Sequence, residues 1–359
     1  MSVRPTATGA RPDEPQAMSR RLRLVQVGPV AFRIDLRMAA RVAFATAALL
    51  ALGAWGLTLG SFRLPLADVV RALLGSAPAD AAFIVMGLRL PRVLAAMLVG
   101  PALAMSGAIF QGLLRNPLVS PDVIGINAGA SVAAVWWIIS HRPPVLLPVV
   151  AFAGALGAAA AVYLLTWRGH ISGARLILVG IGAHALLTAG TTALIVRANV
   201  YEAATAYRWM TGSLAGSDWG DVATLAAALA LLVPAGLVLM WPLRALQYGD
   251  QTARSLGLPL ERTRLALMAV GCALSAVAVS VAGPVGFVAF MVPHLARMLA
   301  GPVGGGLFLF TGALGGLLLL GADLLGQHAL PVSLPVGVIT AALGAPYFLF
   351  LLYRTNAQM

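Results

Sequence analysis

The residues that could do chemistry in this 359-residue chain do not form a catalytic pattern. All 24 basic residues are Arg, whereas a phosphate-binding loop of the G-x-x-x-x-G-K-S/T type needs a Lys to reach the terminal phosphates. The five His residues are scattered, so no H-E-x-x-H zinc motif can be written. The single Cys272 has no disulfide partner. We therefore expect no catalytic residue, metal site or cofactor site in this chain, and any ATP that powers it must bind to another subunit.

A short polar stretch from Tyr248 to Pro259 has the pattern of a docking helix. Asp250 can cap the free amides at the start of a helix, and Gly257 suits the left-handed residue after its end. Pro259 prevents the helix from continuing. A helix of about two turns is too short to span a membrane but can lie in a groove on a partner. On this pattern alone, a plain solvated connector is the alternative.

The composition places these residues in a membrane protein. The chain is 60% hydrophobic and 10% charged, with a mean hydropathy of +0.91, whereas about a quarter of the residues in a soluble domain are charged. A transmembrane helix needs ~20 apolar residues. We predict ten apolar segments, near residues 38–58, 91–112, 120–140, 145–167, 175–196, 221–242, 264–282, 285–300, 304–322 and 336–353.

The Arg residues predict the orientation of these segments. Residues 1–37 form a polar, Arg-rich tail, and the membrane domain is predicted over 38–359. An even number of spans puts both termini on one side, and most of the 24 Arg residues then lie in the tail and in loops on that side. The positive-inside rule makes this side the cytoplasm. The pair Arg20 and Arg21 leaves a twin-arginine export signal as an alternative for the tail.

Acidic residues are absent from the centres of the predicted spans. Those nearest to a span, Asp122, Asp221 and Asp323, lie at segment ends. Coupling to protons or sodium usually needs ionisable groups within the spans, which disfavours a cation-coupled secondary transporter. Backbone carbonyls can also bind sodium, so this class stays an alternative. A non-transporting membrane scaffold is another, against which the polar motifs in the apolar body argue.

Several short motifs occur in order between about Met38 and Tyr353. They are Arg89 to Arg92, Val99 to Gly107, Phe110 to Gly112, Arg115 to Leu118, Pro121-Asp122, Asn127 to Ala130, Trp209 to Leu214, Gly249 to Gly257, Ala282 to Phe287, Val292 to Arg297, Gly321 to Asp323, Leu334 to Val338 and Gly344 to Pro346. Together they resemble the permeases of binding-protein-dependent ABC importers for iron-siderophores, haem and vitamin B12. Any one of these motifs alone would be a weak match.

The resemblance implies an all-α polytopic membrane protein of the type II importer permease fold, with ten transmembrane helices per subunit. It implies a second permease subunit, with a homodimer favoured over a heterodimer. It also implies two ATPase subunits that bind ATP and Mg. A periplasmic substrate-binding protein would deliver the substrate, and no nucleic acid is involved. The protein would then lie in the bacterial inner membrane with both termini in the cytoplasm.

The resemblance also assigns residues to contacts with the partners. The coupling region covers about residues 244–263, and its candidates for ATPase coupling are Gly249, Asp250, Ala253, Arg254, Leu256 and Gly257. Arg89 and Arg92 match an outer Arg pair that receives acidic residues of the binding protein; an interfacial snorkelling pair is the alternative. Where the vitamin B12 member has a further basic residue, this chain has Gln327 and His328.

Two further groups are implied by position. The cytoplasmic gate would contain Asn116, Leu118, Ser172, Gly173 and Ala174, and the translocation path would contain His184, Thr188, Thr191 and Arg208. A lone His on an apolar span is more often a satisfied structural residue, and Arg208 beside Trp209 is equally an interfacial anchor. His294 and Arg297 are interpreted as a structural clasp in which Arg297 bonds to exposed helix carbonyls. The expected substrate is a ferric siderophore, then haem, then vitamin B12.

Overall fold

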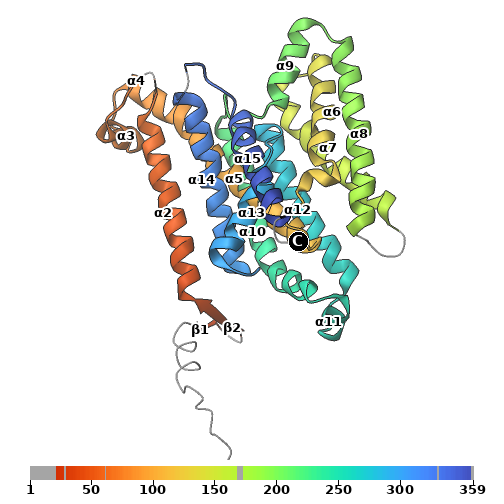
Figure 1. The fold of residues 1–359 in the computed structure, drawn as a ribbon. Helices are drawn as coiled ribbons and strands as arrows, with labels where there is room; N and C mark the ends of the chain where they lie inside the picture. Colours follow the sequence, from red (N-terminus) through yellow and green to blue (C-terminus); the bar gives the residue numbers. More distant parts are fainter. Residues whose placement is uncertain (1–21, 28–29, 61, 168–172, 330, 357–359) are drawn as a thin grey trace, which may run out of the picture.

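The computed structural model describes residues 22–27, 30–60, 62–167, 173–329 and 331–356, and they form a helical bundle with a small hairpin at its start (Figure 1). Strands β1 (Leu22–Val27) and β2 (Val30–Asp35) pair antiparallel. The helices are α2 (Leu36–Thr58), α3 (Leu66–Leu73), α4 (Ala79–Ala82), η1 (Phe83–Arg89), α5 (Leu90–Leu113), η2 (Pro121–Ile124), α6 (Ile126–Ile139), η3 (Pro144–Leu146), α7 (Leu147–Thr166), α8 (Gly173–Arg197), α9 (Val200–Met210), α10 (Trp219–Gln247), α11 (Asp250–Ser255), α12 (Leu260–Ala282), α13 (Val288–Ala300), α14 (Gly305–His328) and α15 (Val336–Asn356).

Each of the ten predicted apolar segments coincides with a helix. Among the described residues, seven helices are long and apolar enough to cross a membrane, and the remaining three segments contain the shorter apolar helices 126–139, 288–300 and 336–351. The hairpin β1–β2 and the short helix α11 lie at one end of the bundle, while α3, α4 and α9 lie at the other (Figure 1). We refer to these as the α11 end and the α9 end.

Several predicted boundaries differ from the helices, and the starts of the second and third segments differ for a local reason. The second segment is predicted from residue 91, but the helix runs without a break from Ala79 to Leu113. Its π-helical part η1 shifts the hydrogen bonds by one residue just before Pro91, so that the Leu90 amide donates to the Val85 carbonyl. The third segment is predicted from residue 120, but helix α6 begins only at Ile126, because Gly125 (φ +79°) takes the left-handed conformation after η2.

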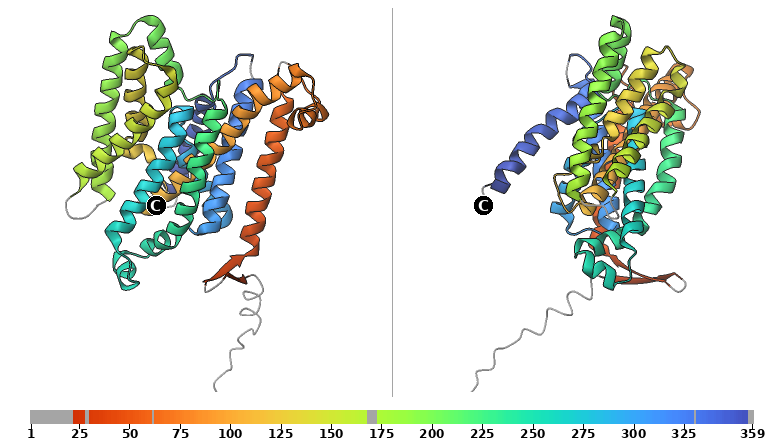
Figure 2. Two further views of the ribbon diagram at one scale, coloured as in Figure 1. Left: turned by 180° about the vertical axis from the view of Figure 1, so that it is seen from behind. Right: turned by 90° about the vertical axis from the view of Figure 1, so that its right-hand side faces the viewer.

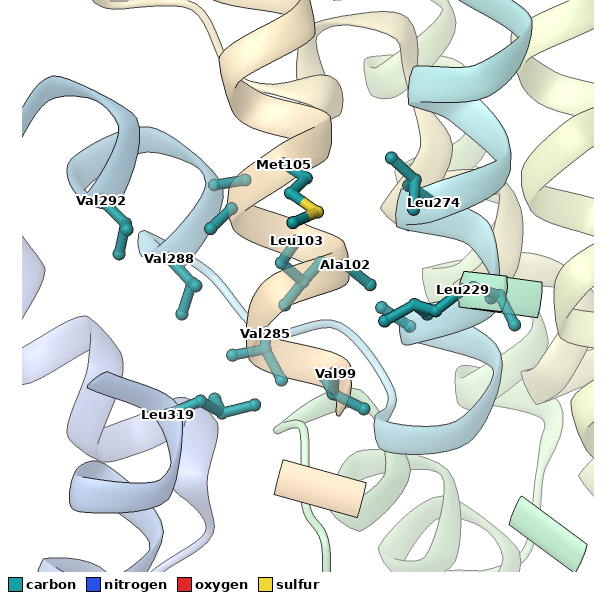
Figure 3. Close-up of a cluster of buried hydrophobic side chains, with 14 of the residues drawn as sticks. Val99, Ala102, Leu103, Met105, Leu229, Leu274, Val285, Val288, Val292 and Leu319 are labelled. Carbon is teal, nitrogen blue, oxygen red and sulfur yellow. The ribbon is translucent and has the colours of Figure 1, made fainter. Parts of the chain in front are cut away.

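Helix α5 lies at the centre of the bundle and packs against α14, α12, α10 and α13. Figure 3 shows its side chains, among them Val99, Leu103 and Met105, surrounded by side chains of these helices. The closest contacts are made by backbone. A Cβ atom at Gly100 would lie 2.3 Å from the Gly315 carbonyl oxygen of α14, and one at Gly107 would lie 1.8 Å from the Ala289 carbonyl oxygen of α13. Small residues thus let the helices approach where lipid provides no hydrophobic drive for association.

We predict that Gly107→Ala destabilises the protein by about 3 kcal/mol, since the methyl group would overlap a backbone carbonyl that cannot move without shifting α13. The free energy of unfolding of the full chain, measured by titration with a denaturing detergent, tests this. The control is Gly157→Ala on α7, where a Cβ meets no atom within 4 Å. It should be neutral or slightly stabilising, because Ala is the better helix former. Equal stability of the two variants would contradict the prediction.

Candidate functional site

The α11 end carries the short helix predicted for docking. Its end agrees with the prediction: Gly257 is left-handed (φ +79°), and its amide donates to the Arg254 carbonyl at 2.9 Å. Its start does not. Gly249 (φ +110°) is the N-cap residue, and the Asp250 side chain caps no amide. The Asp250 carboxylate is instead taken up by two Arg side chains.

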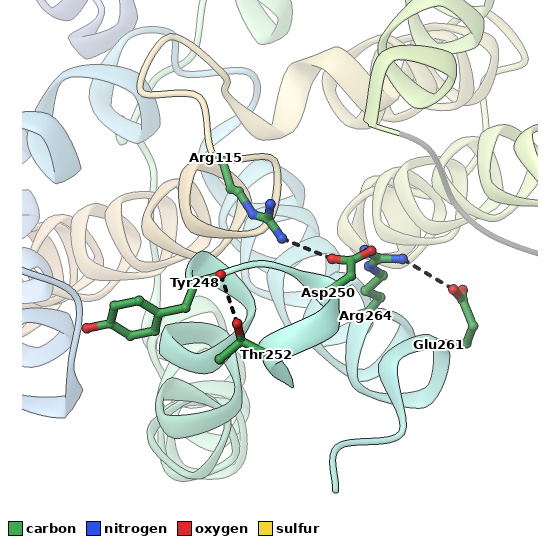
Figure 4. A network of polar contacts seen from close by, with 6 residues as sticks. All are labelled: Arg115, Tyr248, Asp250, Thr252, Glu261 and Arg264. Carbon is green, nitrogen blue, oxygen red and sulfur yellow. Dashed lines mark hydrogen bonds and ion pairs between the residues drawn. The ribbon is translucent and has the colours of Figure 1, made fainter. Parts of the chain in front are cut away.

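These two ion pairs connect α11 to the rest of the bundle (Figure 4). One Asp250 oxygen lies 3.0 Å from Nη2 of Arg115, which follows α5, and the other lies 2.7 Å from Nη2 of Arg264 on α12. Arg264 also pairs with Glu261 at 3.2 Å. Partial burial opposes ionisation of Asp250, but the hydrogen bond and charge of Arg264 and the charge of Arg115 outweigh it and lower the pKa of the carboxyl. Asp250 therefore positions α11 relative to the end of α5.

The other coupling candidates divide between an inner and an outer side of α11. Ala253 is fully buried and packs inward, so it offers no surface to a partner. Arg254 and Leu256 are exposed, and around Gly249 and Gly257 a Cβ would meet no atom within 4 Å. The exposed side chain of Tyr248 precedes them. The surface left open by α11 thus consists of aromatic, aliphatic and cationic groups and two open glycines.

The residues predicted for the gate lie at the same end. The Asn116 side chain accepts a hydrogen bond from the Leu118 amide at 2.9 Å, which fixes the loop after α5. A Cβ at Gly173 would lie 3.3 Å from Leu114, so the start of α8 approaches this loop. Ala174 lies next in α8, and Ser172 lies outside the described residues. The structure thus brings the loop after α5 and the start of α8 together.

A buried polar clasp joins α5 to α13. The Gln111 amide donates to the Phe290 carbonyl at 2.8 Å, and the Arg297 guanidinium donates to the Gln111 carbonyl oxygen. The His294 ring meets Tyr347 of α15 edge-on, with 6.3 Å between the ring centroids. The predicted clasp is present, but its predicted partner is wrong: Arg297 bonds to the side chain of Gln111 on α5 and, among the described residues, to no helix carbonyl. Gln111 was missed as its centre, although its motif Phe110 to Gly112 was a signal for it.

At the α9 end, the two Arg residues predicted for docking have separate partners within the chain. Arg89 donates to the Leu57 carbonyl at 2.8 Å and to the Phe62 carbonyl. Arg92 forms a two-point ion pair with Asp323 of α14, at 3.0 and 2.8 Å. Gln327 donates to the same carboxylate at 2.7 Å. The two guanidinium groups therefore do not form one fork, and Arg92 in particular holds α5 to α14.

The predicted path residues lie on α8 and α9. His184 and Thr188 are exposed on α8 in the single chain. Thr191 is buried, and its hydroxyl donates to the Leu187 carbonyl at 3.0 Å. Arg208 is exposed on α9. The structure therefore presents three of these four side chains at the surface of the chain and keeps Thr191 inside.

Comparison with known proteins places these features in a family. The FecCD transport family model matches residues 48–354. The ferric enterobactin transport system permease protein FepG of Escherichia coli (strain K12) is 42% identical over 308 residues, which are 85% of this chain and 93% of FepG. The achromobactin transport system permease protein CbrC of Dickeya dadantii (strain 3937) is 40% identical over 327 residues, or 90% of this chain and 93% of CbrC.

A cobalamin permease and a solved structure are also similar. The cobalamin import system permease protein BtuC of Halobacterium salinarum is 40% identical over 280 residues, or 77% of this chain and 74% of that protein. A solved metal-chelate type ABC transporter in an inward-facing conformation is 27% identical and superposes with a TM-score of 0.78, covering 88% of this chain and 99% of that chain. The similarity therefore extends over nearly all of the helical bundle.

We predict that Arg92→Met destabilises the chain by about 3 kcal/mol, because it leaves the Asp323 carboxylate, 2% exposed, without its counter-charge. The double variant Arg92→Met/Asp323→Leu should recover most of the loss. The unfolding free energies of the two single variants and the double variant measure the coupling. The exposed pair Arg71 and Asp68 is the control, for which Arg71→Met should cost less than about 1 kcal/mol. Additive effects of Arg92→Met and Asp323→Leu would contradict the prediction.

We predict that the amides of α11 lose protection against hydrogen exchange in acid. Because the pKa of Asp250 is lowered from its ordinary value of 3.8, its ion pairs contribute fully above that value and are lost as the pH falls through the lowered one. Asp250→Asn should speed exchange of α11 by a factor of about two to five at pH 7 and remove the acid effect. Asp68→Asn, in the surface pair on α3, should leave α11 unchanged. Unaltered exchange in Asp250→Asn would show that the pairs do not hold α11.

Proposed function

The chain belongs to the FecCD transport family, and on that premise we propose that it is the ten-span permease subunit that forms the translocation path for a ferric siderophore. Membership makes it a permease of an ABC importer and a multi-pass protein of the inner membrane. The ten helices that coincide with the predicted apolar segments support the ten-span count. One structural observation carries the rest: the short helix α11, held by Asp250 against α5 and α12, leaves an open face at one end of the bundle.

We assign this open face to an ATPase subunit that supplies ATP and Mg. The chain has no Lys for a phosphate-binding loop, so the energy has to enter by contact. A face with exposed Tyr248, Arg254 and Leu256 provides the aromatic, cationic and apolar groups that protein interfaces favour. The α11 end would then be cytoplasmic, in agreement with the distribution of Arg residues.

The opposite end is assigned to a periplasmic binding protein. Arg92 donates two of its five N–H groups, from Nε and Nη2, to Asp323. Its remaining N–H groups can donate to an acidic side chain of a partner. Arg89 is held by two carbonyl groups, which leave its charge uncompensated. Docking of acidic residues therefore adds to these contacts and does not require them to break.

The substrate assignment rests on the relatives. FepG and CbrC are named for ferric enterobactin and achromobactin transport, and their alignments cover more than four fifths of this chain. A ferric siderophore is therefore the first candidate. Vitamin B12 is the second, because the Halobacterium salinarum cobalamin permease is 40% identical; haem is a third, from the sequence resemblance alone.

Reconstitution tests this proposal. The full chain is placed in proteoliposomes with the ATPase and binding protein of its own system, and uptake of ferric enterobactin, ferric achromobactin, haem and cobalamin is measured with and without ATP. We expect ATP-dependent uptake of a ferric chelate only. Cobalamin or haem uptake would overturn the substrate, and uptake that survives without ATP but collapses with the ion gradient would establish a secondary transporter.

In the same vesicles, we predict that Gly257→Val uncouples ATP hydrolysis from transport. Gly257 is left-handed and its surroundings are open within the chain, so a branched side chain both strains the end of α11 and obstructs a partner. Transport should fall at least about tenfold while hydrolysis persists. Gly216→Val is the matched control, since Gly216 (φ +86°) is equally open but lies at the α9 end. A normal ratio of transport to hydrolysis in Gly257→Val would refute the assignment of α11.

A further inference from the structure

A large apolar groove crosses the surface of the bundle away from the features described above. It has a volume of about 980 Å³, which is at the upper end of the range for small-molecule sites. Helix α12 forms its floor with Ala273, Val277 and Val281. The start of α7 and the first half of α10 form its two walls, both of which pack against α12. The groove therefore runs along the helices in the half of the bundle that is nearer to the α9 end.

The rim of the groove is apolar and open. Val145 of η3, just before the first wall, is 85% exposed, Val149 of that wall is 61% exposed, and Leu231 of the other wall is 72% exposed. Large apolar side chains around an apolar floor are stable in contact with hydrocarbon and unfavourable in contact with water. Because α7, α10 and α12 all have the length and composition of membrane spans, the body of the groove lies at the depth of lipid tails.

The mouth of the groove at the α9 end is acidic. Asp218 and Asp221 form a capping box at the start of α10, in which each carboxylate accepts the amide of the other residue through one oxygen. Among the described residues, the second oxygens, Oδ2 of Asp218 and Oδ1 of Asp221, accept no hydrogen bond. None of the described residues that line the groove is basic. The mouth thus provides two carboxylate oxygens for a cationic donor.

The groove also faces away from α15. In the side view of Figure 2, α15 and α10 lie on opposite sides of the bundle. The apolar body and the acidic mouth of the groove together fit an occupant that combines long apolar chains with a cationic hydrogen-bond donor at one end.

We propose that this groove is a specific site for a phospholipid with a primary ammonium headgroup, of the phosphatidylethanolamine type. The acyl chains lie on the α12 floor between α7 and α10, and the ammonium group donates to the free oxygens of Asp218 and Asp221. A charge-assisted N–H to carboxylate hydrogen bond selects this headgroup over a trimethylammonium group, which has no N–H to donate, and over an anionic glycerol headgroup. The site is independent of the transported substrate.

The test is lipid retention by the full chain in mild detergent, measured by native mass spectrometry with phosphatidylethanolamine, phosphatidylcholine and phosphatidylglycerol of identical chains. We expect phosphatidylethanolamine to bind at least about fivefold more tightly than either of the others. Asp218→Asn/Asp221→Asn should reduce its binding to the level of phosphatidylcholine. Asn keeps the cap of α10, so the helix itself is preserved.

Two further variants separate the groove from the general lipid shell. Ala228→Phe on α10 should fill the groove and remove the tightly held lipid, and Ala273→Leu, from the floor, should do the same if Ala228→Phe fails to fold. Ala227→Phe is the control, because Ala227 is exposed on the same helix but does not line the groove. Equal retention of the three lipids, or unchanged retention in the groove variants, would overturn the proposal. The proposed transport function is tested separately, by ATP-dependent uptake, so failure of the lipid proposal would leave that function standing.

Discussion

The contact of α5 with its neighbours, backbone against backbone, is the constraint on which the rest of the structure depends. Gly100 and Gly107 leave no room for even a methyl group between α5 and the carbonyls of α14 and α13. In lipid, such close contact provides the dispersion energy that a hydrophobic core provides in water. In the apolar window of the long helix that ends with α5, 72% of the residues are buried, against 17% for α10. Helix α5, which packs against α14, α12, α10 and α13, is therefore the buried axis of the bundle.

Both ends of this axis carry ion pairs to other elements. At the α9 end, Arg92 of α5 binds Asp323 of α14, and at the α11 end, Arg115, just after α5, binds Asp250. Between them, the hydroxyl of Ser106 donates to the Gly271 carbonyl at 2.6 Å and Gln111 joins α13. Polar groups at low dielectric need partners, so each of these bonds also fixes the rotation of α5. The ion pair between Asp250 and Arg115 thus connects α11 to a helix that reaches the opposite end of the bundle.

The sequence predicts the membrane helices better than it predicts the polar contacts between them. Each apolar segment predicted from the hydrophobic runs coincides with a helix, and among the described residues seven of these helices are long and apolar enough to cross a membrane, a length that the thickness of the bilayer sets. The local rule for helix caps fails at Asp250, where it was applied, and holds at Asp35, for which no cap was predicted. Asp35 caps α2 by accepting the amides of Arg37 and Met38, whereas the Asp250 carboxylate is taken by Arg115, which lies far away in the chain. A pattern of neighbouring residues contains no information on such a distant competitor. Pro91 likewise predicts the start of a span, but the helix continues across it, because the π-helical turn η1 immediately before it joins α5 without a break.

Helix α8 differs from α10 in a way that bears on assembly. Both are long, apolar and little buried in the single chain, at 11% and 17% of their apolar windows. The exposed positions of α10 include Leu231 and Val238, whose wholly apolar side chains are stable in contact with lipid. Those of α8 include His184, which forms no hydrogen bond with the described residues. An imidazole facing hydrocarbon would leave two ring nitrogens unsatisfied, whereas one facing a water-filled path between two subunits would not. The exposed face of α8 therefore favours a boundary with protein and water, and that of α10 a boundary with lipid.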